Sequence, residues 1–168
     1  MKRASRGLAE RGDIFLPGNP CNHAFGRGLE PKNAACFSYP PCWGDNNKGQ
    51  SDPPEGTNYV AVSAGQFHSC AIDTTGAVSC WGNNFKGATE PPEGVIFAAI
   101  SSGSFQNCGL DTDGTIACWG STKDGEDNPT SGRFVDIGMG TTHGCARSED
   151  GGIACWGNNE QGQQEIPD

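Results

Sequence analysis

Short apolar segments separated by glycine-rich turns make up most of the chain from residue 59 onward. In three of these segments apolar side chains alternate with other residues at a period of two, which is typical of half-buried β-strands. The alternating pairs are Val60 and Val62, Ala98 and Ile100, and Val135 and Ile137. In the first unit the pattern predicts two further strands at 67–72 and 77–82, and weakly indicates a fourth around 87–90. We therefore expect an all-β protein.

The predicted strands belong to an internal repeat about 38 residues long. The triplet Cys-Trp-Gly occurs four times, and its tryptophans are 38, 38 and 37 residues apart: Trp43, Trp81, Trp119 and Trp156. Repeats of this length build solenoids and propellers, in which each unit buries its apolar face against a neighbour. The repeat predicts a partial β-propeller of about three to four blades, each an antiparallel sheet, with the tryptophans packed between blades.

The repeat also divides the chain into segments. Residues 59–96, 97–133 and 134–168 are each expected to form one blade, and residues 42–58 a partial repeat. Residues 1–41 lack the strand pattern and the turn sequence of the repeat, so we expect an atypical N-terminal segment that is poorly ordered or misassigned.

Six of the nine cysteines form pairs that stand ten residues apart, with a turn sequence ending in glycine midway between them. The pairs are Cys70 and Cys80, Cys108 and Cys118, and Cys145 and Cys155. Opposed residues of such a hairpin lie within disulfide range, so the spacing predicts three disulfides and an oxidising compartment. Zinc is the alternative, but the closely spaced ligand pairs that it prefers are absent. Cys36 or Cys21 is the candidate partner of Cys42.

The charge of the chain narrows the choice of partner. The net charge is −9, whereas nucleic acids and anionic membranes require a basic surface, so neither is expected as a partner. The longest apolar run has six residues, Val95 to Ile100, against about 20 for a membrane-spanning helix. No apolar segment of the signal-peptide type follows Lys2 and Arg3. An extracellular, periplasmic or cell-surface location therefore implies a longer precursor.

Residues 63–84, Ser-Ala-Gly-Gln-Phe-His-Ser-Cys-Ala-Ile-Asp-Thr-Thr-Gly-Ala-Val-Ser-Cys-Trp-Gly-Asn-Asn, resemble repeats of the regulator of chromosome condensation superfamily. They are most similar to its short, cysteine-bearing bacterial form, to the crinkly repeats of plant receptor kinases and to the propeller of the second β-lactamase inhibitor protein. The resemblance covers residues 42–168 and implies seven blades in complete members. This chain would then be part of a larger propeller.

The order of strands in such a blade predicts which loops share a face. The loops after the first and third strands lie together at one end of the blades, and are rich in aromatic and amide side chains, a composition suited to recognition. The candidate binding residues are Phe67, Phe85, Phe105, Asn83, Asn84, Asn158 and Asn159. We expect them to bind a protein or a glycan; ordinary polar loops are the alternative.

No nucleophile, phosphate loop or metal-ligand cluster is visible in the sequence, so no catalytic residue, cofactor or metal is expected. The leading interpretation is a non-catalytic extracellular scaffold, with self-association through open blade faces as a further expectation. One alternative is a regulator of guanine-nucleotide exchange on a GTPase, and another is a nonfunctional gene fragment. A hydrolase with a propeller-borne site is the least favoured.

Overall fold

Each repeat folds into one three-stranded antiparallel sheet in the computed structural model, which describes residues 42–55, 58–121, 129 and 131–166. Blade 1 consists of β1 (Tyr59–Ala64), β2 (His68–Asp73) and β3 (Val78–Gly82). Blade 2 consists of β4 (Phe97–Ser102), β5 (Gln106–Asp111) and β6 (Ile116–Gly120). Blade 3 consists of β7 (Phe134–Met139), β8 (His143–Ser148) and β9 (Ile153–Gly157). The predicted N-terminal segment 1–41 lies outside the described residues.

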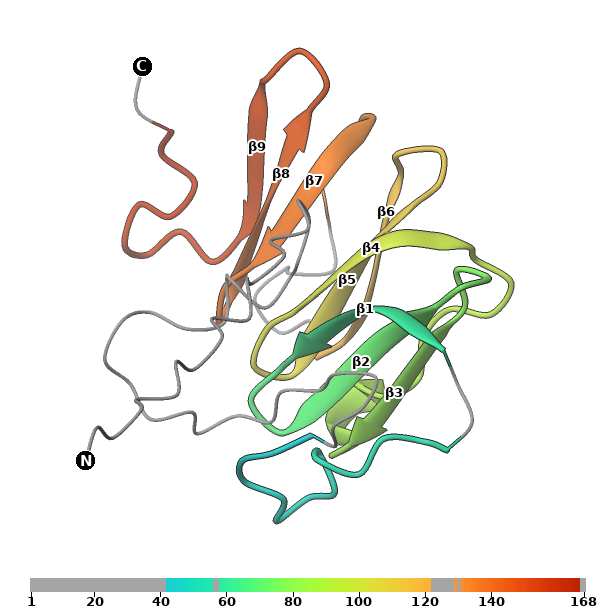
Figure 1. The fold of residues 1–168 in the computed structure, drawn as a ribbon. Coiled ribbons are helices and arrows are strands. Elements are labelled where there is room, and N and C mark those ends of the chain that lie inside the picture. Colours follow the sequence, from blue (N-terminus) through green and yellow to red (C-terminus); the bar gives the residue numbers. More distant parts are fainter. Residues whose placement is uncertain (1–41, 56–57, 122–128, 130, 167–168) are drawn as a thin grey trace, which may run out of the picture.

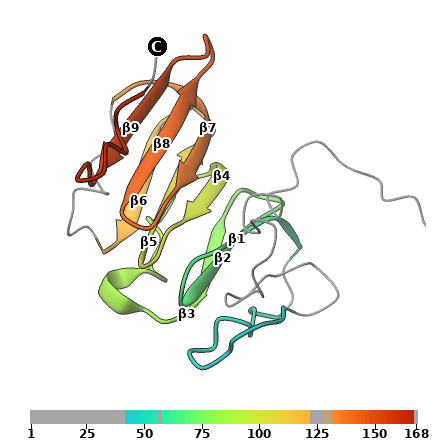
Figure 2. The same cartoon turned by 90° about the vertical axis from the view of Figure 1, so that its left-hand side faces the viewer.

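The blades stand side by side, and the first strand of blades 2 and 3 lies against the first and second strands of the blade before it (Figure 1; Figure 2). This arrangement is that of propeller blades, in which the first strand of each sheet lies closest to the axis. It confirms the all-β fold class and the partial propeller predicted from the repeat. The described residues include no helix long and apolar enough to cross a bilayer.

The turn between the second and third strands follows from its sequence. In blade 1 the N–H of Gly76 donates to the carbonyl of Asp73 (3.0 Å), and the N–H of Asp73 donates to the carbonyl of Ala77 (3.0 Å). Gly76 has a φ of 83°, and its counterparts Gly114 and Gly151 have similar values. Only glycine adopts this conformation without a steric penalty, so the tight hairpin depends on it.

The period-two pattern located the first strand of each blade, and the second residue of each predicted pair (Val62, Ile100 and Ile137) packs in a core, but the first residue of each pair is exposed. A β-bulge between Tyr59 and Ala61 interrupts the alternation, and blades 2 and 3 have the same irregularity. As a result Val60 is 62% exposed and Val135 is 48% exposed. The aromatic residue that begins the strand takes that place in the core, as with Phe97, which is 3% exposed.

The weakly indicated fourth strand around 87–90 is wrong. A short 3-10 segment, η2 (Phe85–Gly87), and a turn occupy this position, and no fourth strand follows β3 or β9 within the described residues. Local hydrogen bonds explain the difference: the N–H of Gly87 donates to the carbonyl of Asn84, and the N–H of Ala88 to that of Phe85. Asparagine side chains that bond to nearby backbone compete with strand pairing.

Aromatic side chains join the blades. Phe97 and Trp119 of blade 2 lie 5.7 Å apart between ring centroids and pack on Cys70 and Ile72 of blade 1. The contact between blades 2 and 3 repeats this core with Phe134, Trp156, Cys108 and Leu110. Burying each aromatic side chain contributes roughly 1.5–3 kcal/mol. The two cores therefore lie between the sheets, where a single three-stranded sheet could not form one.

The partial repeat continues the same stack at the other end. Trp81 of blade 1 packs against Cys42, and its indole N–H donates to the carbonyl of Gln50 (2.9 Å). Ser69 Oγ donates to the same carbonyl (2.9 Å). Trp43 is 43% exposed. Three of the four repeated tryptophans thus lie against the unit that precedes them in sequence.

The cysteines occupy the positions that their spacing predicted. Disulfides link the three pairs, and in each pair the Cα atoms are 4.0 Å apart: Cys70–Cys80, Cys108–Cys118 and Cys145–Cys155. The strand register confirms the predicted hairpins. Cys42 is also disulfide-bonded, and Cys21 and Cys36 lie outside the described residues.

The disulfides differ in their access to solvent, which predicts an order of reduction. Cys70 and Cys108 are 0% exposed because the next blade covers them, whereas both Cys145 and Cys155 are partly exposed. We expect a phosphine reductant to open Cys145–Cys155 first, measured by alkylating thiols at intervals and mapping peptides by mass spectrometry. In denaturant, where no blade covers another, the three disulfides should be reduced at equal rates. Equal rates in the native state would contradict the unequal burial.

Candidate binding face

Three phenylalanine side chains from two blades meet at one end of the stack. Phe67, in the loop between β1 and β2, stacks on Phe105 of the equivalent loop in blade 2, with ring centroids 5.5 Å apart. Phe85, in η2, meets Phe105 edge to face at 5.2 Å. Phe85 is 50% exposed and the other two rings are half-buried. We refer to these three residues as the phenylalanine cluster.

The antiparallel order of the strands brings these loops together. The chain leaves the first strand and the third strand of a blade at the same end, so the loops that begin at residues 65 and 83 are neighbours (Figure 1). In blade 3 the residue equivalent to Phe67 and Phe105 is Thr142. The aromatic surface is therefore confined to blades 1 and 2.

The four candidate asparagines hold the loops in shape. Asn83 Oδ1 accepts the N–H of Phe85 (2.8 Å), and Asn84 Oδ1 accepts the N–H of Thr89 (3.1 Å). In blade 3, Asn158 and Asn159 accept the backbone N–H groups of residues 160 and 164 in the same way. Their carbonyl groups are thus occupied within the loops. In both blades the doubled asparagine stands three residues before a glycine, a pattern that could have indicated a turn here in place of the expected strand.

Backbone strain marks the loop that carries Phe85. Lys86, the next residue, has a φ of 58°, and it has the only positive φ of a non-glycine residue in the described part of the chain. Such a conformation costs about 1–2 kcal/mol for a residue with a Cβ atom. Strain of this kind persists where the surroundings enforce it, and it concentrates at functional sites.

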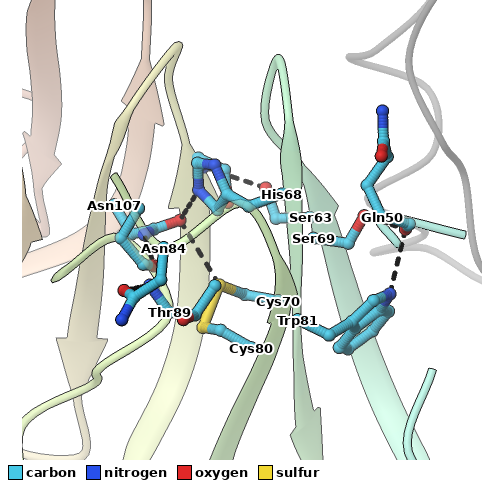
Figure 3. Close-up of a disulfide and its surroundings, with 12 residues drawn as sticks. Gln50, Ser63, His68, Ser69, Cys70, Cys80, Trp81, Asn84, Thr89 and Asn107 are labelled. Carbon is cyan, nitrogen blue, oxygen red and sulfur yellow. Dashed lines mark hydrogen bonds between the residues drawn. A yellow bond between two sulfur atoms is a disulfide. The ribbon is translucent and has the colours of Figure 1, made fainter. Parts of the chain in front are cut away.

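A buried hydrogen bond joins His68 of blade 1 to Asn107 of blade 2 (Figure 3), and both residues closely follow phenylalanines of the cluster in sequence. His68 follows Phe67 in sequence, and its Nε2 lies 2.8 Å from Oδ1 of Asn107, two residues after Phe105. Asn107 Nδ2 donates to the carbonyl of Ala88 (2.8 Å), which orients the amide so that Oδ1 faces the imidazole. His68 Nε2 must then be the donor.

Burial controls the charge of His68. The side chain is 1% exposed, and its Nδ1 has no hydrogen-bond partner within the described residues. Desolvation therefore lowers the pKa of His68 below 6.5, and the bond to Asn107 offsets part of this effect. A proton added at Nδ1 would place an unpaired charge between blades 1 and 2.

At the opposite end of the blades, the carboxylates in the turns mostly accept hydrogen bonds from groups of the same turn. Asp73 Oδ1 accepts the Thr75 hydroxyl and backbone N–H groups, and these bonds lower the pKa of Asp73. Across the described ranges, no group of three or more His, Cys, Asp or Glu side chains is placed to hold a metal ion.

The fold and its internal repeat define a stack of β-propeller blades. The sequence profile of the regulator of chromosome condensation (RCC1) repeat matches residues 59–88 and 134–163. The chain therefore carries RCC1-type repeats. A search of curated protein sequences finds no match.

Solved structures support the same assignment. The ectodomain of receptor kinase CR4 from Physcomitrella patens is 31% identical, with a TM-score of 0.60 over 69% of this chain and 32% of that one. The crinkly ectodomain of receptor kinase ACR4 from Arabidopsis thaliana is 29% identical, with a TM-score of 0.60 over 69% of this chain and 43% of that one.

A more distant structure agrees in fold. Prp20p from Saccharomyces cerevisiae is 15% identical, with a TM-score of 0.63 over 71% of this chain and 41% of that one. The chain thus spans between about a third and two fifths of the length of these three proteins.

The His68 contact predicts a pH dependence of stability. Because the folded-state pKa is below the unfolded value of 6.5, its contribution is fully present above pH 6.5 and is lost as pH falls toward the folded pKa. Gln106 occupies the same repeat position and donates to the carbonyl of Thr141 (2.9 Å), so His68→Gln offers an uncharged replacement.

We expect the free energy of unfolding of the wild-type chain to fall as the pH drops below 6.5, as measured by denaturant titration. His68→Gln should flatten this dependence while keeping the blades joined, and His68→Ala should lower stability at every pH. An unchanged slope in His68→Gln would show that another group titrates.

Proposed function

We propose that the chain is a non-catalytic, extracytoplasmic propeller module that binds a protein through the phenylalanine cluster. The observation that carries this proposal is the meeting of Phe67, Phe85 and Phe105 from two blades, with half of Phe85 open to solvent. Aromatic side chains in partly formed pockets are the usual energetic centres of protein interfaces. Loops fixed by a rigid scaffold are the usual place to present them.

The polar groups around the cluster favour a protein over a glycan. Sugar recognition depends on free amide and carboxylate groups that can bond hydroxyls. Here the asparagine carbonyls are already occupied, and Asn84 Nδ2 donates to Glu90 Oε1 (2.7 Å). The exposed Phe85 ring lies beside the exposed Lys86 in sequence, which suits a partner with an apolar residue flanked by acidic ones.

Two further points support the proposed location and the absence of exchange activity. Three disulfides persist only in an oxidising compartment, and the two neighbours near 30% identity are ectodomains. Prp20p binds Gsp1p and histones and shares the fold alone, so it supports only the general capacity of the architecture to present protein-binding surfaces. A disulfide-free cytoplasmic regulator of a GTPase is therefore the weaker alternative.

The proposal is tested with a photo-crosslinking amino acid placed at position 85 and, as control, at Val135. Val135 is 48% exposed but belongs to β7, outside the cluster. The protein captured only from position 85 is then purified, and its affinity is measured for the wild type, Phe85→Ala and Val135→Ala.

Phe85→Ala should weaken binding by roughly 30-fold, as expected for truncation of a central aromatic anchor, because about 2 kcal/mol is lost. Val135→Ala should leave the affinity unchanged. The melting temperature of Phe85→Ala should match that of the wild type because the ring lies outside both inter-blade cores. Equal affinity for all three proteins would exclude the cluster as the binding site.

A further inference from the structure

Three loops in the described part of the chain follow a Cys-Trp-Gly triplet and share one framework of hydrogen bonds: 45–50, 83–88 and 158–163. In each loop the side-chain oxygen of the first residue accepts the N–H of the third. The asparagine at the second position accepts the N–H of the residue that follows the loop. These bonds are between 2.8 and 3.1 Å long in all three loops. The loops can therefore be compared position by position.

The last residue distinguishes loop 83–88 from the other two. In the other loops it is a glutamine, whose Oε1 accepts the N–H of the residue two positions earlier at 2.8 Å: Gln50 from Lys48, and Gln163 from Gln161. Ala88 has no side-chain acceptor for the N–H of Lys86. Lys86 has a φ of 58°, whereas the matching residues of the other loops have no positive φ. The loop without the glutamine bond is thus the loop with the strained residue.

The same loop is the one that carries an aromatic ring. Phe85 occupies its third position, where the other two loops have Asn47 and Glu160. The Phe85 ring meets Phe105 of blade 2 at 5.2 Å between centroids. The aromatic residue, the strained lysine and the missing glutamine therefore occur together in one loop.

The missing glutamine is matched by a larger side chain on the strand that contacts the loop. The carbonyl of Gln50 accepts Ser69 Oγ (2.9 Å), and the equivalent carbonyl of Ala88 accepts Asn107 Nδ2 (2.8 Å). Ser69 and Asn107 are each the second residue of the second strand of a blade, and all four residues are buried. A large loop residue with a small strand residue is thus exchanged for a small one with a large one, and buried contacts tolerate exchanges that compensate in volume.

The exchange allows Asn107 to reach the preceding blade. Its Oδ1 lies 2.8 Å from Nε2 of His68 in blade 1, and Figure 3 shows Asn107 beside His68 and Ser69 beside Gln50. The bonded residues follow the three rings closely in sequence: His68 follows Phe67 by one residue, Asn107 follows Phe105 by two, and Ala88 follows Phe85 by three. One buried amide therefore connects the backbone segments that carry all three rings.

We propose that Asn107 and Ala88 are positioning residues of the phenylalanine cluster. Asn107 fixes the distance between the segments that carry Phe67 and Phe105. Ala88 leaves the loop in the strained form in which Phe85 reaches Phe105. The consequence for binding rests on the proposed function of the cluster: rings that are already held in place lose less conformational freedom when a partner binds.

The positioning is tested by giving the contact the residues found at Gln50 and Ser69, with Ala88→Gln and Asn107→Ser together. Nuclear Overhauser effects between isotope-labelled aromatic rings report which rings are in contact. We expect the double variant to lose the effects that join Phe105 to Phe67 and to Phe85. The effect between Phe97 and Trp119, whose centroids lie 5.7 Å apart in the core between blades 1 and 2, should remain. Retention of the effect between Phe85 and Phe105 would overturn the role of Ala88.

Asn107→Ser alone gives a second variant, which adds no bulk to the contact. A serine hydroxyl can donate to the Ala88 carbonyl as Ser69 donates to that of Gln50, but it is too short to reach His68. We expect this variant to fold and to lose the effect between Phe67 and Phe105. Its retention would overturn the role of Asn107.

Ile116→Val is the control for lost stability, because Ile116 is buried in the core between blades 2 and 3. Shortening a buried isoleucine destabilises the fold, but here it should leave all the effects within the phenylalanine cluster in place. Loss of those effects in Ile116→Val would show that they follow general stability and would overturn the specific role of Asn107 and Ala88.

Binding measurements separate this inference from the proposed function. The purified protein captured at position 85 is the probe, and the double variant should bind it about tenfold more weakly because its rings must be ordered on binding. Lost ring contacts with an unchanged affinity would exclude the cluster as the binding site and leave the positioning role intact. Retained ring contacts would overturn the positioning role and leave the proposed function intact.

Discussion

The structure depends on one kind of contact, in which an aromatic pair of one blade packs on the disulfide-bearing face of the blade before it: Phe97 and Trp119 on blade 1, and Phe134 and Trp156 on blade 2. A three-stranded sheet has too little apolar surface to fold by itself, so each blade gains its core only from its neighbours. Removing a buried aromatic side chain such as Trp119 costs about 3–5 kcal/mol, a large part of the 5–15 kcal/mol that stabilises a typical domain.

The dipeptide Cys-Trp gives this stack its direction. Consecutive residues of a strand point to opposite faces of the sheet, so the cysteine and the tryptophan face opposite ways. In blade 2, Cys118 faces blade 3 and Trp119 faces blade 1. The disulfide therefore stiffens the hairpin and also forms part of the surface on which the next tryptophan packs. Two adjacent positions thus encode both sides of every inter-blade contact.

Features encoded within one repeat could be predicted from the sequence, and features that depend on two repeats could not. The hairpin, its glycine and the pair Cys70–Cys80 all lie within 11 residues, and the structure contains them as expected. The bulge at Tyr59 could not be read from alternation, because it changes which side of the strand faces the core. The fourth strand failed because the Asn84 side chain binds its own loop.

The candidate site also combines features encoded within one repeat with features that depend on two repeats. Strand order placed Phe67, Phe85 and Phe105 at one end of the blades, but only the spacing between blades decides whether their rings touch. The 2.8 Å contact of His68 with Asn107 helps to fix that spacing near the rings, and the repeat positions of these two residues differ by one. A repeat pattern aligns equivalent positions of the units, so it does not reveal a contact between two positions that are not equivalent.

The offset pair also links the stability of the stack to the shape of the binding face. His68 and Asn107 follow the loop phenylalanines by one and two residues, so any change in the distance between their strands moves Phe67 relative to Phe105. Blade 3 has Gly144 in place of the asparagine and Thr142 in place of the phenylalanine. Where the chain lacks the offset contact it also lacks the aromatic ring, which is consistent with a binding face that requires rigid support.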